Sequence, residues 1–256
     1  MNDQNIYTGR NSQIGQYLPD NLHYVHYDIK DETTWGFLHD CSNLFLIVPK
    51  IPYVLEYCKN FIYTAKQAGV KKIVKIGSMG SWRVIHNQID TYIRDCGINC
   101  ISFDMSVLMN NIFTEQYIGT TLLNYRHDTP APYLDPKALA EAIEQAMNRE
   151  ALLNFNIKAT GRFQYSIEDV KRILELNGYP VNSIETIHNN QLHKNAGVSA
   201  DQRLMSDISD NYSLGIYPLI STDITRMFGA VHRTLEHFVV EDVDYYTKSY
   251  EGDRNL

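Results

Sequence analysis

Residues 44–105 decide the fold of this chain, and they read LFLIVPKIPYVLEYCKNFIYTAKQAGVKKIVKIGSMGSWRVIHNQIDTYIRDCGINCISFDM. The apolar runs at 44–48, 72–76 and 99–104 predict strands that are buried on both faces, as in a parallel sheet. Apolar residues recur at helical spacing over 51–68 and 84–96, and Gly69 and Gly97 stop these two helices. Strands that alternate with helices in this way predict right-handed crossovers. The predicted fold class is therefore α/β, with half of a doubly wound, Rossmann-like nucleotide-binding sheet.

The segment before this stretch is shorter than such a fold normally needs. A strand is predicted at Ile6–Tyr7, and the next strand is predicted at residues 22–28. The chain between them is long enough for only one minimal crossover. We therefore expect the usual second strand to be missing. The predicted sheet order is 22–28, 6–8, 44–48, 72–76 and 99–104, with no strand outside 22–28.

The rest of the chain predicts several further elements in one structural unit. Residues 1–132 form the predicted Rossmann-like core, and residues 133–256 complete the sheet and add a smaller C-terminal cap on the substrate side. Helices are predicted at 33–39, 107–117, 136–148, 166–177, 190–205 and from Thr234 to Phe238, and strands at 155–159 and 181–187.

Composition excludes several functional classes. The 256 residues carry a net charge of −7 without a lysine or arginine run, so we expect no direct nucleic-acid partner. No apolar run approaches the ~20 residues of a membrane span, and the N-terminus does not resemble a signal peptide. The four cysteines form no CxxC pair, which indicates reduced core thiols. These features predict a cytoplasmic protein without a membrane partner.

Several stretches together resemble the NmrA-like branch of the atypical short-chain dehydrogenases/reductases. The matching segments are Thr8 to Gly15 (TGATGxxG), 45–52 (strand and proline loop), 68–80 (AGVKHVVxxSSxGA), 86–98 (HxxxE…SGL), 108–111 (FMxN) and 233–238 (RTxEEF). The resemblance covers nearly the whole length, and it implies an NAD(P)-binding Rossmann fold with a ligand pocket between sheet and cap.

Two departures from that family concern its chemistry. Its carbonyl reductases use a YxxxK pair and a strand-end serine, and the corresponding residues here are His86, Asp90 and Ser78. Asp90 cannot lower the pKa of a neighbour as a lysine does, and a carboxylate would raise the pKa of His86. The family's RPG segment reads Asp104-Met105-Ser106 and so lacks its arginine. We therefore do not expect ordinary Tyr/Lys hydride transfer.

The candidate catalytic residues are Ser78, His86 and Asp90. His86 and Asp90 lie on one helix face and form either an acid/base pair or a structural hydrogen bond. Ser78 either lines a pocket at the carboxyl edge of the sheet or is an ordinary turn residue. His188 and His193 have no third ligand nearby, so no metal site is predicted.

The cofactor and substrate candidates follow from the resemblance and from the strand ends. Lys50 either contacts a phosphate or carboxylate or is a solvated lysine, and Met109 either walls the pocket or packs in the core. The cofactor candidates are Thr8, Gly9, Ser12, Gly15, Pro49, Lys50 and Gly77, and the pocket candidates are Met105, Met109 and Asn110.

The altered turn predicts no NAD(P)H binding, or only weak binding. Ser12 stands where backbone normally approaches the pyrophosphate, and no second strand is available to contact the adenosine ribose. The first hypothesis is thus a degenerate dinucleotide site that binds a small molecule and catalyses a non-redox step. The alternatives are an NAD(P)H-dependent reductase and an NAD(P)H-sensing or protein-interaction regulator, and a homodimer or protein partner is open in each case.

Overall fold

A computed structural model of the chain describes residues 4–8, 14–18, 22–49, 51–79, 83–124, 129–187 and 220–242. Its centre is a six-stranded parallel sheet with the order β2-β1-β3-β4-β5-β8. The strands are β1 (Gln4–Thr8), β2 (His23–Val25), β3 (Cys41–Leu46), β4 (Lys72–Ser78), β5 (Asn99–Met105) and β8 (Asn156–Ala159). Among the described residues no strand lies between β1 and β2 or outside β2, which agrees with the predicted order.

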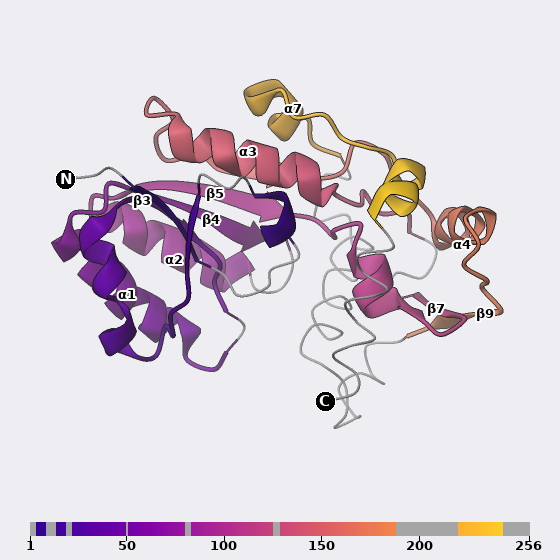
Figure 1. Cartoon of the computed structure of the whole chain (residues 1–256), viewed down its shortest axis with the longest axis horizontal. Helices are drawn as coiled ribbons and strands as arrows, with labels where there is room; N and C mark the ends of the chain where they lie inside the picture. The colour runs from indigo at the N-terminus through magenta and orange to yellow at the C-terminus, as the bar shows by residue number, and fades with distance from the viewer. Residues whose placement is uncertain are drawn as a thin grey trace.

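Helices cover both faces of this sheet (Figure 1). The helices α1 (Val54–Ala68) and α2 (Arg83–Asp95) lie on one face, and α3 (Pro136–Asn148) lies on the other. Gly69 ends α1 with a φ of +96°, a conformation that favours glycine. Asp135 begins α3, because its carboxylate accepts a hydrogen bond from Lys137 N at 3.0 Å. The sequence predicted each of these three helices to within a few residues.

The segment after β5 differs from its prediction. A helix over 107–117 is wrong: only a single π-helical turn forms, at Ile112–Gln116, before a short hairpin of β6 (Tyr117–Ile118) and β7 (Thr121–Asn124). The reason is a tertiary hydrogen-bond pair. Leu134 N donates to Val107 O at 2.7 Å and Met109 N donates to Leu134 O at 3.0 Å, so the backbone there is extended.

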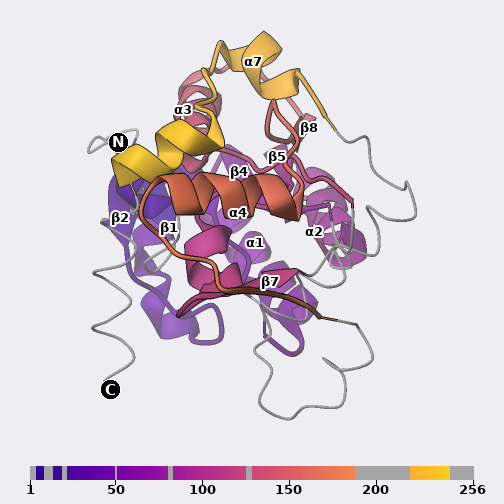
Figure 2. The same cartoon turned by 90° about the vertical axis from the view of Figure 1, so that its right-hand side faces the viewer.

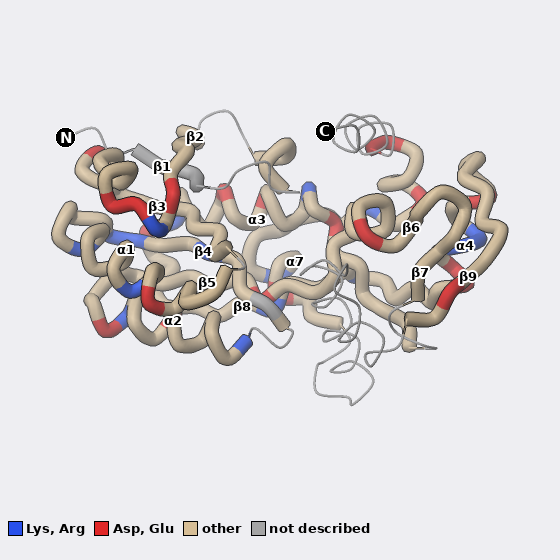
Figure 3. Tube along the Cα trace, turned by 90° about the horizontal axis from the view of Figure 1, so that it is seen from below, with Lys and Arg blue, Asp and Glu red and all other residues tan. Residues whose placement is uncertain are grey.

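A second group of elements lies at one end of the parallel sheet (Figures 2 and 3). It contains the π-helical turn, a three-stranded sheet of β6, β7 and β9 (Ser183–Thr186), α4 (Ile167–Leu176) and a helix over 235–242. Ser166 and Asp169 form a reciprocal capping box at the start of α4. The predicted strand at 181–187 thus belongs to this smaller sheet. The predicted helix at 190–205 lies outside the described residues.

Two predictions near the N-terminus need smaller corrections. The strand at 22–28 is confined to His23–Val25, and the helix at 33–39 is replaced by the 3-10 turns η2 (Glu32–Thr34) and η3 (Gly36–Asp40). Residues 26–30 leave the sheet because side chains hold them elsewhere. Trp35 Nε1 donates to Asp28 O at 2.9 Å, and Asp28 N donates to Thr34 Oγ1 at 3.1 Å. Finally, α7 (Asp223–Phe228) packs beside α3 and β8.

Candidate functional site

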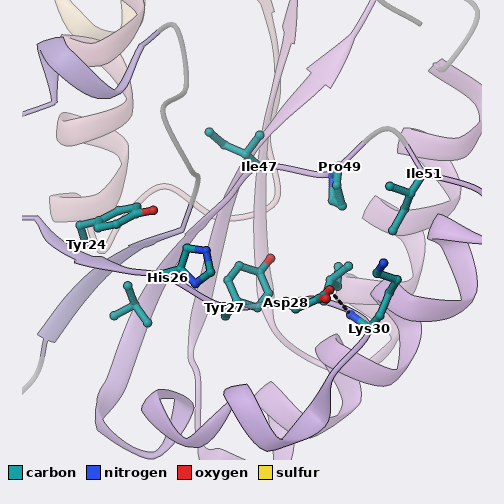
Figure 4. A pocket seen from close by; sticks show the side chains of 10 residues that line it. Tyr24, His26, Tyr27, Asp28, Lys30, Ile47, Pro49 and Ile51 are labelled. Atoms are coloured by element: carbon teal, nitrogen blue, oxygen red, sulfur yellow. Dashed lines mark hydrogen bonds between the residues drawn. The ribbon is translucent and has the colours of Figure 1, made fainter. Parts of the chain in front are cut away.

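A cavity of about 490 Å³ opens where β2 and β3 end (Figure 4). Tyr24, His26 and Tyr27 lie along one wall, and Ile47, Pro49 and Ile51 lie along the opposite wall. Val25, Asp28, Ile29 and Lys30 complete its lining. Open α/β sheets bind ligands at the carboxyl ends of their strands, and the volume is in the range of small-molecule sites.

The groups in this cavity suit a nucleotide. Aromatic rings offer flat faces for a purine, and the Lys30 ammonium is a cation that can pair with a phosphate. The loop that carries them is held in place, because Asp28 Oδ1 accepts a hydrogen bond from Lys30 N at 2.9 Å. Residues 24–30 therefore supply an aromatic and cationic surface at this edge of the sheet.

A second group of polar side chains lies inside the protein, between the sheet and α2. The register pairs Lys75 of β4 with Ser102 of β5 and Gly77 with Asp104, and strand alternation places all four residues on one face of the sheet. Lys75 and Ser102 have no exposed surface, and Asp104 is only 8% exposed. His86 and Asp90 of α2 are likewise buried, so they add to the same cluster.

Lys75 is the centre of this cluster. Its Nζ lies 2.9 Å from Asp90 Oδ1, 3.2 Å from Ser102 Oγ and 3.3 Å from His86 Nδ1. A lysine ammonium has three N–H donors and no acceptor, so these three acceptors satisfy it completely. The paired carboxylate offsets the cost of burying the cation. His86 and Asp90 therefore do not act as an isolated pair, because a cation bridges them.

Asp104 and His86 are the least buried members of the cluster, each 8% exposed. Ser102 Oγ donates to Asp104 Oδ1 at 3.5 Å. Burial raises the pKa of Asp104 above its ordinary value, and the Lys75 ammonium partly offsets that effect. A Cβ atom at Gly77 would lie 2.3 Å from Asp104 Oδ1 and 3.0 Å from Ser102 Oγ, so only glycine leaves room for this carboxyl.

Asp90 has one further neighbour. Cys100 Sγ donates to Asp90 Oδ1 at 3.6 Å, and burial together with the Asp90 charge raises the pKa of the thiol to about 12. Such a thiol stays protonated and unreactive at neutral pH. All four cysteines are free, and three of them are buried. The predicted core position thus holds for Cys41, Cys58 and Cys100, whereas Cys96 is partly exposed.

The N-terminal turn is held by the C-terminal part of the chain. Gly15 opens a 3-10 turn, Gly15–Tyr17, and Tyr17 OH donates to Asp242 Oδ2 at 2.5 Å. The Arg233 guanidinium lies 5.7 Å from the centre of the Tyr17 ring and 2.8 Å from the buried Asp135 carboxylate. Residues 233–242 thus contact the turn whose glycines resemble a dinucleotide motif.

The predicted site residues fall in three different places. Pro49 lines the cavity, and His86, Asp90 and Gly77 belong to the buried cluster. Met105 is partly buried, whereas Met109 and Asn110 are 1% and 0% exposed and line neither this cavity nor the groove between α1 and α2. Thr8 ends β1 and Ser78 ends β4. Gly9, Ser12 and Lys50, like His188 and His193, lie outside the described residues.

Sequence reasoning missed Lys75, Ser102 and the role of Asp104. A signal for Lys75 was available, because a charged residue in the middle of a strand buried on both faces must have a partner. The residues that line the cavity from Tyr24 to Lys30 were also missed, since residues 22–28 were predicted to be a regular strand and the next residues a lead-in to a helix. Among the described residues, no group of three or more side chains could hold a metal ion. No helix in the described ranges is long and apolar enough to cross a membrane.

Comparison with solved structures defines the class of this fold. The matching chains include reductases solved with NADP(H) or NADPH and a nucleoside-diphosphate-sugar epimerase, and the matches cover more than nine-tenths of this chain. At their low sequence identity they establish the fold alone. This chain shares the Rossmann-like α/β fold of these structures, so the fold implied by the sequence resemblance is confirmed.

Three of these structures are particularly informative. The triphenylmethane reductase of Citrobacter sp., complexed with NADP(H), is 16% identical with a TM-score of 0.72, over 91% of this chain and 98% of that chain. The NADPH-dependent quinone oxidoreductase of Escherichia coli, complexed with NADPH, is 15% identical with a TM-score of 0.75, over 92% and 98%. A nucleoside-diphosphate-sugar epimerase of Staphylococcus aureus is 15% identical with a TM-score of 0.75, over 93% and 100%. No protein-family model and no curated protein sequence matches the chain.

The comparisons correct one prediction from the sequence. The expectation that the chain binds no NAD(P)H, or binds it only weakly, is contradicted by neighbours of the same fold that hold NADP(H) and NADPH. That expectation rested on the cofactor contacts that are lost when the turn at 8–15 is altered and the usual second strand is absent. It left out the cavity wall that residues 24–30 form beside β3.

Proposed function

We propose that this protein is an NAD(P)H-dependent reductase of the atypical short-chain dehydrogenase/reductase fold. The adenosine portion of the cofactor binds in the cavity between residues 24–30 and the end of β3, and its nicotinamide portion points toward the carboxyl ends of β4 and β5. The substrate binds on the side of the residues after 132. The observation that carries this proposal is the position of the cavity, at the strand ends where this fold binds ligands.

The reaction does not use a Tyr/Lys pair. Position 86 supplies an imidazole and position 90 supplies a buried carboxylate that is paired with Lys75. His86 lies near the start of α2, and its imidazole is the group in this cluster that can accept a proton at one ring nitrogen while it donates one from the other. In the proposed reaction NAD(P)H supplies the hydride and His86 supplies the proton to the acceptor.

Calorimetric titration with NADPH and NADH tests the binding step. We expect one saturable site with a Kd on the order of 10 μM, or about −7 kcal/mol. The substitution Ile47→Trp fills the cavity and should weaken binding at least tenfold. Thr91→Trp is the matched control, because Thr91 lines a separate groove of about 470 Å³ between α1 and α2. Equal affinity in both variants would place the cofactor elsewhere, and no heat of binding with either dinucleotide would refute the proposal.

A second function is favoured by the burial of Asp90, which has no exposed surface. An aspartate paired inside the protein cannot hold the nicotinamide ribose as a lysine does. The second function is therefore that of an NAD(P)H-sensing regulator, which binds the dinucleotide without oxidising it. NADPH oxidation in the presence of quinones and triphenylmethane dyes separates the two functions. Turnover supports the reductase, whereas tight binding without oxidation supports a regulator.

A further inference from the structure

The environment of His86 is defined by Lys75. The His86 side chain is 8% exposed, and its Nδ1 lies 3.3 Å from Lys75 Nζ. The lysine comes from β4 and the histidine from α2, so the contact joins the sheet to the helix that covers it. In the family's YxxxK pair the lysine lies on this helix, and Asp90 occupies that position here. A lysine nevertheless contacts the helix, because Lys75 of the sheet lies against it.

The chemistry of this contact fixes the proton on the imidazole. Asp90 Oδ1, at 2.9 Å, stabilises the Lys75 ammonium in its charged form. An ammonium only donates, so His86 Nδ1 must accept. A neutral imidazole that accepts at Nδ1 carries its proton on Nε2. The adjacent cation also disfavours an imidazolium, because two positive charges would lie 3.3 Å apart.

We propose that Lys75 is a positioning residue and proton reserve for His86: it holds the neutral imidazole in the Nε2–H tautomer and replaces the proton that Nε2 gives up. The catalytic part of this proposal rests on the proposed reductase function, whereas the tautomer does not.

The proton transfer balances without a further reactant. When a bound NAD(P)H would supply hydride to the acceptor carbon, the Nε2 proton of His86 would pass to the acceptor oxygen and one Lys75 proton would pass to Nδ1. The imidazole stays neutral, and Lys75 becomes an amine. After product release, Nε2 takes up one proton from the solvent, the proton that the reduction consumes, and the Nδ1 proton returns to Lys75, which restores the ion pair with Asp90.

The tautomer can be measured in the cofactor-free protein by ¹⁵N NMR, with His86→Gln used to assign the signal. We expect Nδ1 to be unprotonated and Nε2 protonated at pH 7. A wild-type imidazole that is protonated on Nδ1, alone or together with Nε2, would overturn the proposal.

Variants of Lys75 test its role. Lys75→Met leaves Asp90 unpaired, so the double variant Lys75→Met/Asp90→Asn keeps the fold measurable with two neutral side chains. Its imidazole should lose the Nε2–H preference. The matched control is Lys72→Met: Lys72 is also buried in β4 but lies on the opposite face, where its Nζ donates to the carbonyl oxygens of Ala146, Met147 and Arg149. A double variant that retains the wild-type tautomer would exclude a positioning role for Lys75.

Kinetics separate this proposal from the proposed function. With an oxidisable substrate, the double variant should lose about 10²-fold or more in kcat, the range of general acid catalysis, whereas Lys72→Met should keep most of it. A wild-type protein with the expected tautomer and no NADPH oxidation would refute the reductase alone. A double variant with unchanged kcat would refute the proton reserve alone.

Discussion

Lys75 Nζ and Asp90 Oδ1 lie 2.9 Å apart inside the protein, with side chains that are 0% and 1% exposed. The pair links the middle of β4 to the middle of α2, one helical turn after His86. A buried charge that loses its partner costs far more than an exposed one, since water cannot replace the lost contact. This relationship therefore has consequences for stability as well as for the proposed chemistry.

Removal of one partner should destabilise the fold strongly. We expect Lys75→Met to lower the free energy of unfolding by about 3–5 kcal/mol, because it leaves the Asp90 carboxylate buried without its cation. Adding Asp90→Asn should recover most of this loss. Urea unfolding measures both, with Lys171→Ala as the control. Lys171 forms an exposed pair with Glu175 at 3.9 Å, which should contribute less than about 1 kcal/mol. Equal losses in the single and double variants would contradict this account of the pair.

Gly77 should tolerate no side chain while Asp104 is present. The added methyl group of Gly77→Ala would meet Asp104 Oδ1 at 2.3 Å and Ser102 Oγ at 3.0 Å. We expect a cost of about 1–3 kcal/mol, as for other overpacked sites. In an Asp104→Ala background the same substitution should cost much less, because the nearest atom is gone. A cost that is independent of residue 104 would show that the backbone, not this carboxyl, requires glycine.

Asp104 should make stability depend on pH. Burial raises the pKa of this carboxyl above its ordinary value of 3.8, although Lys75 partly offsets the effect. The folded protein therefore holds a proton on Asp104 more tightly than the unfolded chain does. The resulting stabilisation is fully present below pH 3.8 and is lost as the pH rises through the folded pKa. Urea unfolding at pH values from 4 to 7 should show Asp104→Asn gaining stability relative to the wild type. A difference that stays constant with pH would refute the shift.

Arg233 should be essential to the stability of the C-terminal part. Its guanidinium forms a two-bond contact with Asp135, at 2.8 Å and 3.1 Å, and Asp135 is fully buried. We expect Arg233→Ala to cost about 3–5 kcal/mol in thermal or urea unfolding. Arg226→Ala is the control, because Arg226 is 76% exposed and lies 3.8 Å from Asp223, a contact worth less than about 1 kcal/mol. Similar losses in the two variants would contradict the importance assigned to burial.

The sequence predicted the parts of this fold that local patterns determine. Apolar runs located β3, β4 and β5, and Gly69 and Ser166 marked helix ends. The helix predicted at 107–117 failed, because hydrogen bonds to Leu134, a residue distant in sequence, keep part of that segment extended.

The candidate site was less predictable for the same reason. His86 and Asp90 were visible as a pair at helical spacing, but the lysine that joins them lies on another element. Its contacts depend on the register of β4 against β5 and on the position of α2 over that face. Residue spacing in the sequence determines neither the register of these strands nor the position of the helix.

The contact between Tyr17 and Asp242 bears on the order in which the protein is made. These residues are separated by 225 positions, and the hydroxyl of Tyr17 donates to the Asp242 carboxylate at 2.5 Å. At a synthesis rate of about 5–20 residues per second, Asp242 follows Tyr17 by roughly ten to fifty seconds. All six strands of the parallel sheet, the last of which ends at Ala159, are therefore synthesised before the partner of the turn at Gly15–Tyr17. The turn that is translated first becomes fully held only when residue 242 has left the ribosome.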